Sequence, residues 1–255
     1  MTNFMDNKFE WCGYNWKSEM EGNRIMKSST PWFWYDSDSV LKTDDNVLEF
    51  HIKKNPREIH YYDGNTYYPE MACGIIRSVE EFGYGTFSAE IMLPEGNNLW
   101  PSFWLSGSGN WPPEIDIMEG WTGNNSCFKF TTPYFPYINP SWRTTTDVHY
   151  NDELLEHKHV SSRNVSLFKQ VKNPMYNFVK YECVWTESRI VFKVNGKTTR
   201  TIEGRVCEQL TKNIKNIDKG WKMNVIFNVF CENPQYNKVG MITPMLVKNF
   251  KYEQL

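Results

Sequence analysis

Residues 114–119 read Glu114-Ile115-Asp116-Ile117-Met118-Glu119, which places three carboxylates within six residues of an apolar, strand-like run. The run follows a segment rich in Trp, Gly and Pro that begins at Trp100. Acidic side chains at this density are costly to bury, because like charges must be desolvated and repel one another. The pattern indicates a site at which carboxylates do chemistry, unless the strand lies at the surface with its acids solvated.

Alternation along the strand decides whether the three acids can act together. Side chains at i, i+2 and i+4 share one face of a strand, so Glu114 and Asp116 point one way and Glu119 points the other way. A β-bulge at Ile117-Met118 adds one residue and returns Glu119 to the face of the other two acids. We predict a bulge at this position, since without it the three carboxylates cannot face one cleft.

Paired carboxylates beside aromatic side chains are typical of enzymes that hydrolyse glycosidic bonds. One carboxylate attacks or stabilises the sugar, and the other donates a proton to the leaving oxygen. The proton donor needs a raised pKa, which a close ionised neighbour supplies. Tryptophans near the acids offer flat apolar faces on which sugar rings can stack. These tryptophans are Trp100, Trp104, Trp111 and Trp121.

The same residues resemble the signature of glycoside hydrolase family 16. The resemblance is most specific over Leu99-Trp100-Pro101-Ser102-Phe103-Trp104-Leu105 and residues 114–119, and it extends from about Val47 to the end of the chain. It implies an all-β, concanavalin-like jelly-roll sandwich of two antiparallel sheets with a concave substrate cleft. It also implies a retaining, endo-acting hydrolase in which Glu114 is the nucleophile, Asp116 its assistant and Glu119 the acid/base.

Length and composition fit this class of protein. A chain of 255 residues is a usual length for one β-sandwich, so we expect residues 1–255 to form a single hydrolase domain, and we expect a monomer. Aromatic residues make up 16% of the chain and include 11 Trp, which favours a carbohydrate-facing surface. The net charge of -2 provides no basic field, so we do not expect nucleic acid as a partner.

Seven residues are candidates for substrate binding. They are Trp100, Trp104, Trp111, Trp121, Arg77, His149 and Asn228. The resemblance places Arg77 and His149 in the cleft, although Arg77 could instead pair with Glu90 or Glu70 and His149 could be structural. Asn228 lies in an apolar run at 223–230, where a buried amide needs partners, and sugar hydroxyls could supply them.

Alternation and turn residues predict strands along the chain. The expected strands are 9–16 (or an ordered arm), 31–35 (core or cleft wall), 47–52, 73–78, 84–94, 145–150, 178–185, 189–194, 223–230 and 246–252. Asn195-Gly196 is the strongest hairpin signal, and Asp63-Gly64 predicts a second hairpin. One helix is expected over 206–219, where Leu210 and Ile214 recur at helical spacing.

Residues 121–150 are rich in Pro, Asn, Thr and aromatic side chains, which is typical of a loop that sets specificity. Further candidate sugar platforms in this segment are Tyr134, Tyr137 and Trp142. His157 and His159 have a spacing that metal ligands sometimes show, but no Cys or acid completes a site, so we expect a solvated loop there. Lys248 stands where the resemblance implies an Asp beside a structural calcium, so we expect no metal.

The cysteines and the N-terminus bear on the compartment. The six cysteines include no Cys-x-x-Cys pair, so we expect mostly reduced thiols and no cofactor. The first eight residues lack an apolar segment, and no run is long enough for a transmembrane helix, so we expect no signal peptide and no membrane association. A polysaccharide hydrolase works outside the cell, so we expect an extracellular or periplasmic site of action. We expect either that a leader has been trimmed from this sequence or that the protein is released by a non-classical route, for example with a virus particle.

Together these features predict an endo-acting, retaining hydrolase of a β-linked polysaccharide. Met118 and the Trp-rich loop most resemble the members that cleave β-1,3- or mixed β-1,3/1,4-glucans. A galactan, sulfated or not, or a mucin-type glycan is an alternative, and a sulfated polymer would favour basic residues such as Arg77, Arg143 or Arg163 in the cleft. A second alternative is a non-catalytic carbohydrate-binding module, which has no need of three carboxylates on one bulged strand.

Overall fold

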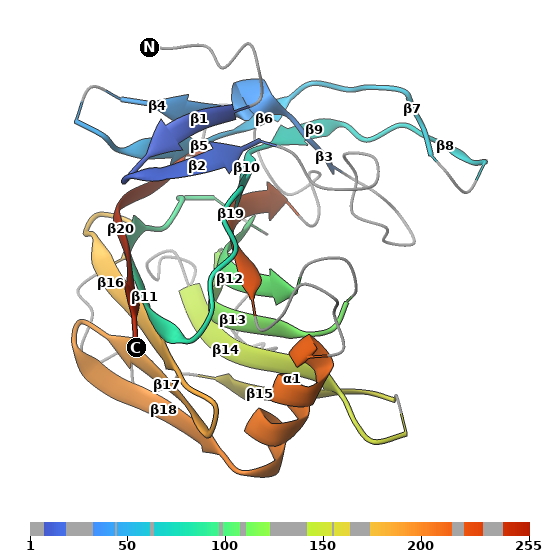
Figure 1. The fold of residues 1–255 in the computed structure, drawn as a ribbon. Helices are drawn as coiled ribbons and strands as arrows, with labels where there is room; N and C mark the ends of the chain where they lie inside the picture. Colours follow the sequence, from blue (N-terminus) through green and yellow to red (C-terminus); the bar gives the residue numbers. More distant parts are fainter. Residues whose placement is uncertain are drawn as a thin grey trace, which may run out of the picture.

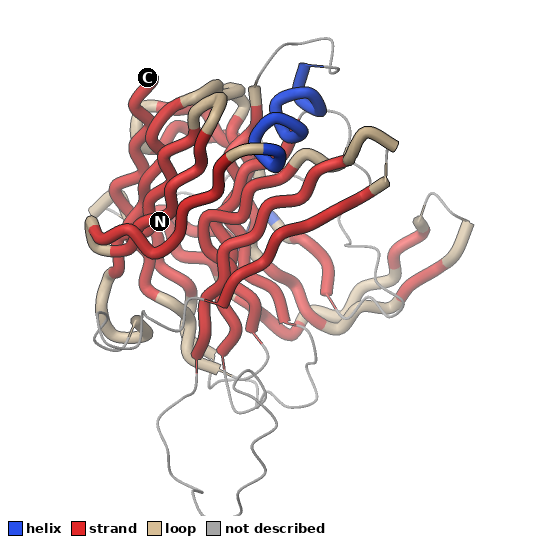
Figure 2. The backbone as a smooth tube through the Cα atoms, turned by 90° about the horizontal axis from the view of Figure 1, so that it is seen from below, coloured by secondary structure: helices blue, strands red, loops and turns tan. Residues whose placement is uncertain are grey.

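The fold is described from a computed structural model. It describes residues 8–18, 33–43, 45–61, 64–96, 99–107, 111–122, 142–154, 156–163, 174–215, 222–231 and 242–255. Most of these residues lie in β-strands that form two large antiparallel sheets, so the expected all-β sandwich is confirmed (Figures 1 and 2).

The first large sheet has eight strands and carries the acidic stretch. In spatial order its strands are β1 (Lys8–Trp11), β2 (Tyr14–Lys17), β10 (Ile75–Ser78), β19 (Met223–Cys231), β12 (Leu99–Gly107), β13 (Glu114–Thr122), β14 (Trp142–Asn151) and β15 (His157–Arg163). The predicted arm at 9–16 is therefore an edge hairpin, β1–β2, which turns at Cys12-Gly13 with positive φ at both residues.

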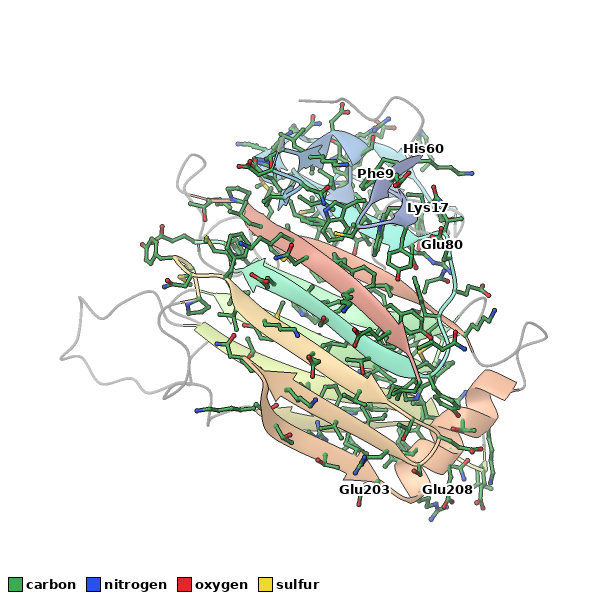
Figure 3. All side chains as sticks on the ribbon, turned by 60° about the vertical axis from the view of Figure 1, so that its left-hand side comes forward. Phe9, Lys17, His60, Glu80, Glu203 and Glu208 are labelled. Carbon is green, nitrogen blue, oxygen red and sulfur yellow. The ribbon has the colours of Figure 1, made fainter. Side chains whose placement is uncertain are left out.

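The second large sheet has seven strands. In spatial order they are β18 (Lys197–Glu203), β17 (Arg189–Val194), β16 (Val179–Trp185), β11 (Gly85–Met92), β20 (Met245–Gln254), β5 (Leu48–Phe50) and β4 (Val40–Lys42). Figure 3 looks onto this sheet and shows β20, β11, β16, β17 and β18 side by side. The Asn195-Gly196 turn joins β17 and β18 with φ values of 48° and 78°, as expected for a type I′ hairpin.

Two smaller sheets lie at one end of the sandwich. One has the order β3 (Phe33–Tyr35), β9 (Met71–Cys73) and β6 (Ile52–Lys54), and its β3–β9 pair is parallel, which the sequence did not predict. The other is the hairpin of β7 (Ile59–His60) and β8 (Thr66–Tyr67) around Gly64. This hairpin projects from the body of the molecule (Figures 1 and 2).

Two apolar clusters position the site. The larger one fills the space between the two large sheets and includes fully buried side chains such as Phe103, Phe227 and Trp185. The second covers the opposite face of the eight-stranded sheet, where Phe33 and Tyr35 of β3 pack with Phe230. The predicted strand at 31–35 thus serves both as core and, through Tyr35, as part of the wall of a cleft.

The single described helix is α1 (Arg205–Lys215), close to the predicted 206–219, and it packs against β14 (Figure 1). Within the described residues, no helical segment has the length and hydropathy that a membrane span requires. The five described cysteines are free thiols, namely Cys12, Cys73, Cys183, Cys207 and Cys231. An η1 turn (Ser37–Ser39) precedes β4.

One predicted loop is wrong, and another is shorter than expected. The expected strand at 145–150 is confirmed within β14, which also includes residues 142–144 of the loop expected over 121–150; Thr144, Thr146 and Val148 alternate inward and pack against the interior. His157 and His159 lie in β15, not in a solvated loop, because that segment pairs in register with β14, although both side chains remain exposed. The candidate platforms Tyr134 and Tyr137, and the Cys127 thiol, lie outside the described residues.

Candidate active site

Strand β13 carries the three acids and contains the predicted bulge. On the β12 side, Phe103 pairs with Met118 and Trp104 pairs with Asp116, so Ile117 is the extra residue. On the β14 side the register shifts between Asp116 and Glu119, at the same place. The bulge at Ile117-Met118 is therefore confirmed.

The bulge sends apolar and acidic side chains to opposite faces. Ile115, Ile117 and Met118 are buried in the main core. Glu114, Asp116 and Glu119 all line a cleft on the other face, which has a volume of about 570 Å³. A regular strand would have left Glu119 on the core side, so this irregularity is what assembles the three carboxylates.

Aromatic rings form most of the apolar wall of the cleft. They are Tyr35, Trp100, Trp104, Trp111 and Phe230. Trp100 donates its indole N–H to Glu119 Oε1 over 3.0 Å, and Trp104 donates to Asn228 Oδ1 over 2.6 Å. The two indoles are therefore held in place by polar partners, while their rings remain available to a sugar.

Trp111 and a group of histidines surround Glu114. The Trp111 indole N–H donates to Glu114 Oε2 over 3.1 Å, and the Trp111 side chain is 54% exposed. His149 Nε2 lies 3.6 Å from Glu114 Oε1 and 3.5 Å from Asp116 Oδ2. His149 Nδ1 lies 3.0 Å from His157 Nε2, so an N–H···N hydrogen bond joins the two rings and fixes the orientation of His149.

The electrostatics of the cleft favour protonated carboxyl groups. Burial raises the pKa of Glu114 to about 8, the Asp116 charge adds to this effect, and His149 and the Trp111 hydrogen bond oppose it. Burial, Asp116 and Asp147 raise the pKa of Glu119 to about 10. Burial and Asp147 raise the pKa of Asp116 well above its ordinary range. The two glutamates thus differ in how readily they ionise, as an acid and a nucleophile must.

Asp147 is a fourth carboxylate in the cleft that the sequence did not reveal as a site residue. It lies on β14 directly opposite Asp116 and is 6% exposed. Thr145 donates its hydroxyl to Asp147 Oδ2 over 3.1 Å and lies 3.4 Å from Glu119 Oε2. The spacing Thr145, Asp147, His149 in a strand was the signal that could have found it, since His149 was expected in the cleft and i-2 shares its face.

The remaining predicted binding residues are placed as follows. Asn228 lines the cleft, and its amide nitrogen is buried with no hydrogen-bond partner among the described residues. Arg77 is not among the described residues that line the cleft; its guanidinium donates a hydrogen bond to Asn224 Oδ1. Glu90 lies 3.7 Å from Lys248, on the other large sheet. Trp121 and Trp142 lie on β13 and β14, but their side chains, like those of Arg143 and Arg163, are outside the described set.

Within the part of the chain that the structure describes, two groups of side chains have ligand atoms close enough to surround a cation. They are Glu114, Asp116 and His149, and Asp116, Glu119 and Asp147, with atoms within 4.8 Å of one another in each group. A cation bound by either group would displace protons from these carboxyl groups, because their pKa values are raised without one. We assign no metal ligand.

Sequence comparison places the chain near known glycanases. The family described as glycosyl hydrolases family 16 matches residues 27–230. An endo-1,3-1,4-β-glycanase, EglC, of Rhizobium meliloti (strain 1021) is 36% identical over 53 residues, which is 20% of this chain and 11% of that protein. A galactan endo-β-1,3-galactanase of Flammulina velutipes is 30% identical over 112 residues, 43% of each chain. This chain therefore spans less than half the length of these curated relatives.

Solved structures share the fold. A structure from work on endo-acting O-glycanases of the human gut microbiota aligns with a TM-score of 0.67 at 16% identity, over 99% of this chain and 88% of that chain. A family 16 enzyme of Bacteroides ovatus in complex with a mixed-linkage glucan product aligns with a TM-score of 0.62 at 20% identity, over 99% and 98%. At these identities the likeness establishes the jelly-roll fold.

Proposed function

The chain belongs to the glycosyl hydrolases of family 16, and on this premise we propose that it is an endo-acting, retaining hydrolase of a β-linked polysaccharide. The observation that carries the proposal is the bulge of β13, which turns Glu114, Asp116 and Glu119 into one cleft walled by indole rings. Carboxylates on one strand beside aromatic platforms provide both the chemistry and the binding surface that glycoside hydrolysis requires.

The proposed reaction has two steps. Glu114 attacks the anomeric carbon and forms a glycosyl ester, while Glu119 gives its proton to the leaving glycosidic oxygen and that C–O bond breaks. Water then attacks the anomeric carbon, gives one proton to Glu119, and releases the Glu114 carboxylate. Two successive inversions at the same carbon leave the product with the configuration of the substrate.

Several contacts support these roles. His149 and the Trp111 N–H oppose the burial that raises the pKa of Glu114, so Glu114 ionises more readily than Glu119. Asp116 lies between the two glutamates on the strand and adds negative charge that keeps the proton on Glu119. Glu119 accepts the Trp100 N–H, which holds its carboxyl group in the cleft.

The walls of the cleft favour a neutral sugar. Among the described residues that line the cleft, none is Lys or Arg. Tyr35, Trp100, Trp104 and Trp111 can stack on pyranose rings, and the buried Asn228 amide can donate to a hydroxyl. We propose a β-1,3- or mixed β-1,3/1,4-glucan as the substrate, since EglC is an endo-1,3-1,4-β-glycanase by name and the Bacteroides ovatus enzyme is named for mixed-linkage glucan. A neutral galactan or a mucin-type glycan is the alternative, since the galactanase and the O-glycanases act on those.

The test is turnover on a panel of laminarin, lichenan, β-1,3-galactan, mucin O-glycans, agarose, porphyran and carrageenan. We expect shortening of one of the neutral polymers, with the anomeric configuration retained in the first product by proton NMR. Glu114→Gln and Glu119→Gln should abolish turnover while the fold remains intact, and Glu90→Gln, on the other large sheet, should leave turnover unchanged. Inverted product, or an active Glu114→Gln variant, would refute the mechanism; binding of a glycan with no cleavage by the wild-type chain would indicate a binding module.

We further propose that the chain works outside the cell or in the periplasm, because polymeric glycans are found there. We propose that residues 1–255 act as one domain, which the shared core of the two large sheets supports, and that the protein is a monomer. Light scattering coupled to gel filtration tests this, and a mass near 30.3 kDa is expected.

A further inference from the structure

Asp147 has no part in the two-step reaction described above, yet its carboxyl group is buried beside another carboxyl group, which is energetically unfavourable. It faces Asp116 directly across the β13–β14 ladder, and the two side chains are 6% and 4% exposed. Like charges opposite one another on neighbouring strands destabilise a sheet. Two buried carboxylates in such register cannot both remain ionised without a proton or a cation nearby.

The oxygens of Asp147 lie close to the proton donor. One oxygen each of Asp147, Asp116 and Glu119 falls within 4.8 Å of the other two. The Thr145 hydroxyl lies 3.1 Å from Asp147 Oδ2 and 3.4 Å from Glu119 Oε2, so it sits between the two carboxyl groups. A hydroxyl has one proton to donate, so it can serve one of these oxygens at a time. A proton on Glu119 can form a hydrogen bond to Asp147, so that the two carboxyl groups share it.

A cation lies close to Asp147. The Arg200 guanidinium donates from Nη1 to the backbone oxygen of Thr146 over 2.6 Å, next to Asp147 in the chain. Its positive charge interacts with Asp147. Arg200 therefore places a positive charge near Asp147.

We propose that Asp147 is a positioning residue that holds the acidic hydrogen on Glu119, and so keeps this glutamate ready to protonate the leaving oxygen. This inference rests on the proposed function of the same cleft. The charged and titratable groups that face Asp147 are Glu114, Asp116 and Glu119 on β13, His149 on its own strand, His159 on β15 and Arg200 on β18. Among them Asp116 and Glu114 act on the Glu119 carboxyl group in the same direction as Asp147.

The consequence appears at alkaline pH. Burial, Asp116 and Asp147 together raise the pKa of Glu119. Removing the charge of Asp147 lowers that pKa, so Glu119 loses its proton at a lower pH. The alkaline limb of kcat/KM, which reports the acid of the free enzyme, must then move toward acid.

The experiment compares the wild-type chain with Asp147→Asn, which keeps the shape of the side chain, and with Asp147→Thr, which suits a strand if the first variant does not fold. Glu90→Gln is the matched control, because it removes a carboxylate from the other large sheet. The readouts are the pH profile of kcat/KM and the titration of the Glu119 carboxyl C=O band by difference infrared spectroscopy without substrate. Subtraction of the Glu119→Gln spectrum identifies that band.

We expect the alkaline limb and the Glu119 band to move toward acid by about one pH unit or more in the Asp147 variants, as is usual for loss of a neighbouring charge, and not in Glu90→Gln. A Glu119 band that titrates unchanged in a folded Asp147 variant, or that moves toward alkali, overturns the inference. If the wild-type chain cleaves no glycan, the proposed function fails, while the infrared titration still decides the role of Asp147.

Discussion

Glu114→Gln should stabilise the fold at neutral pH while it removes the nucleophile. The Glu114 side chain is 15% exposed, and burial is the main cause that raises its pKa from 4.5 to about 8. A carboxyl group whose pKa is higher in the folded state contributes its full stability below pH 4.5. That contribution is lost as the pH rises toward 8, because the unfolded chain releases the proton first.

The size of the effect follows from this pKa. Between pH 4.5 and pH 7 lie 2.5 pH units, each worth about 1.4 kcal/mol. At pH 7 the free energy of unfolding should therefore be about 3 kcal/mol lower for the wild-type chain than for the glutamine variant. At pH 5 the same reasoning gives less than about 1 kcal/mol. The amide oxygen of Gln can still accept the Trp111 N–H, so little packing is lost.

Urea unfolding at pH 5 and pH 7 measures the difference. Glu182→Gln is a control of opposite sign: burial would raise the pKa of Glu182, but hydrogen bonds from Lys193 and Lys180 lower it. That variant should lose stability at pH 7 and lose less near pH 3. The reasoning is refuted if Glu114→Gln is no more stable than wild type at pH 7, or if its gain is equal at both pH values.

Further outcomes follow from the same site. In wild type, kcat/KM should rise as pH approaches 8, where Glu114 becomes ionised, and fall as pH approaches 10, where Glu119 loses its proton; a profile with no alkaline limb up to pH 10 contradicts these roles. Trp104→Phe should raise KM about three- to tenfold with little change in kcat, because Asn228 loses one hydrogen bond; an unchanged KM would show that this pair does not meet the substrate. Deletion of Ile117 should abolish activity as fully as Glu119→Gln, because it removes the bulge; an active deletion variant with native circular dichroism would contradict the account.

The fold and the acidic stretch were predictable because both are local in sequence. Strand alternation marks most of the sandwich, and Asn195-Gly196 specifies its turn without distant partners. The bulge was predictable because the spacing of Glu114, Asp116 and Glu119 makes sense only with one extra residue. Each of these features depends on interactions within a few residues.

The features that the sequence missed depend on pairing between distant segments. Asp147 became part of the site through the register of β14 against β13, and that register is set by packing in the core. Trp104 and Asn228 are 124 residues apart, and His157 meets His149 because β15 pairs with β14. No local pattern fixes such pairings, so the strand expected at 145–150 did not by itself show that Thr145 and Asp147 lie opposite Glu119 and Asp116.

Strand β19 is buried at every position, because it has packed side chains on both faces. Met223, Val225, Phe227 and Val229 belong to the core between the sheets, whereas Asn228 and Phe230 line the cleft. Substitutions at Asn228 and Phe230 can therefore change what the cleft accepts, while Met223, Val225, Phe227 and Val229, on which the sandwich depends, stay the same. At this end of the strand, residues that contact the substrate cleft alternate with residues that stabilise the core.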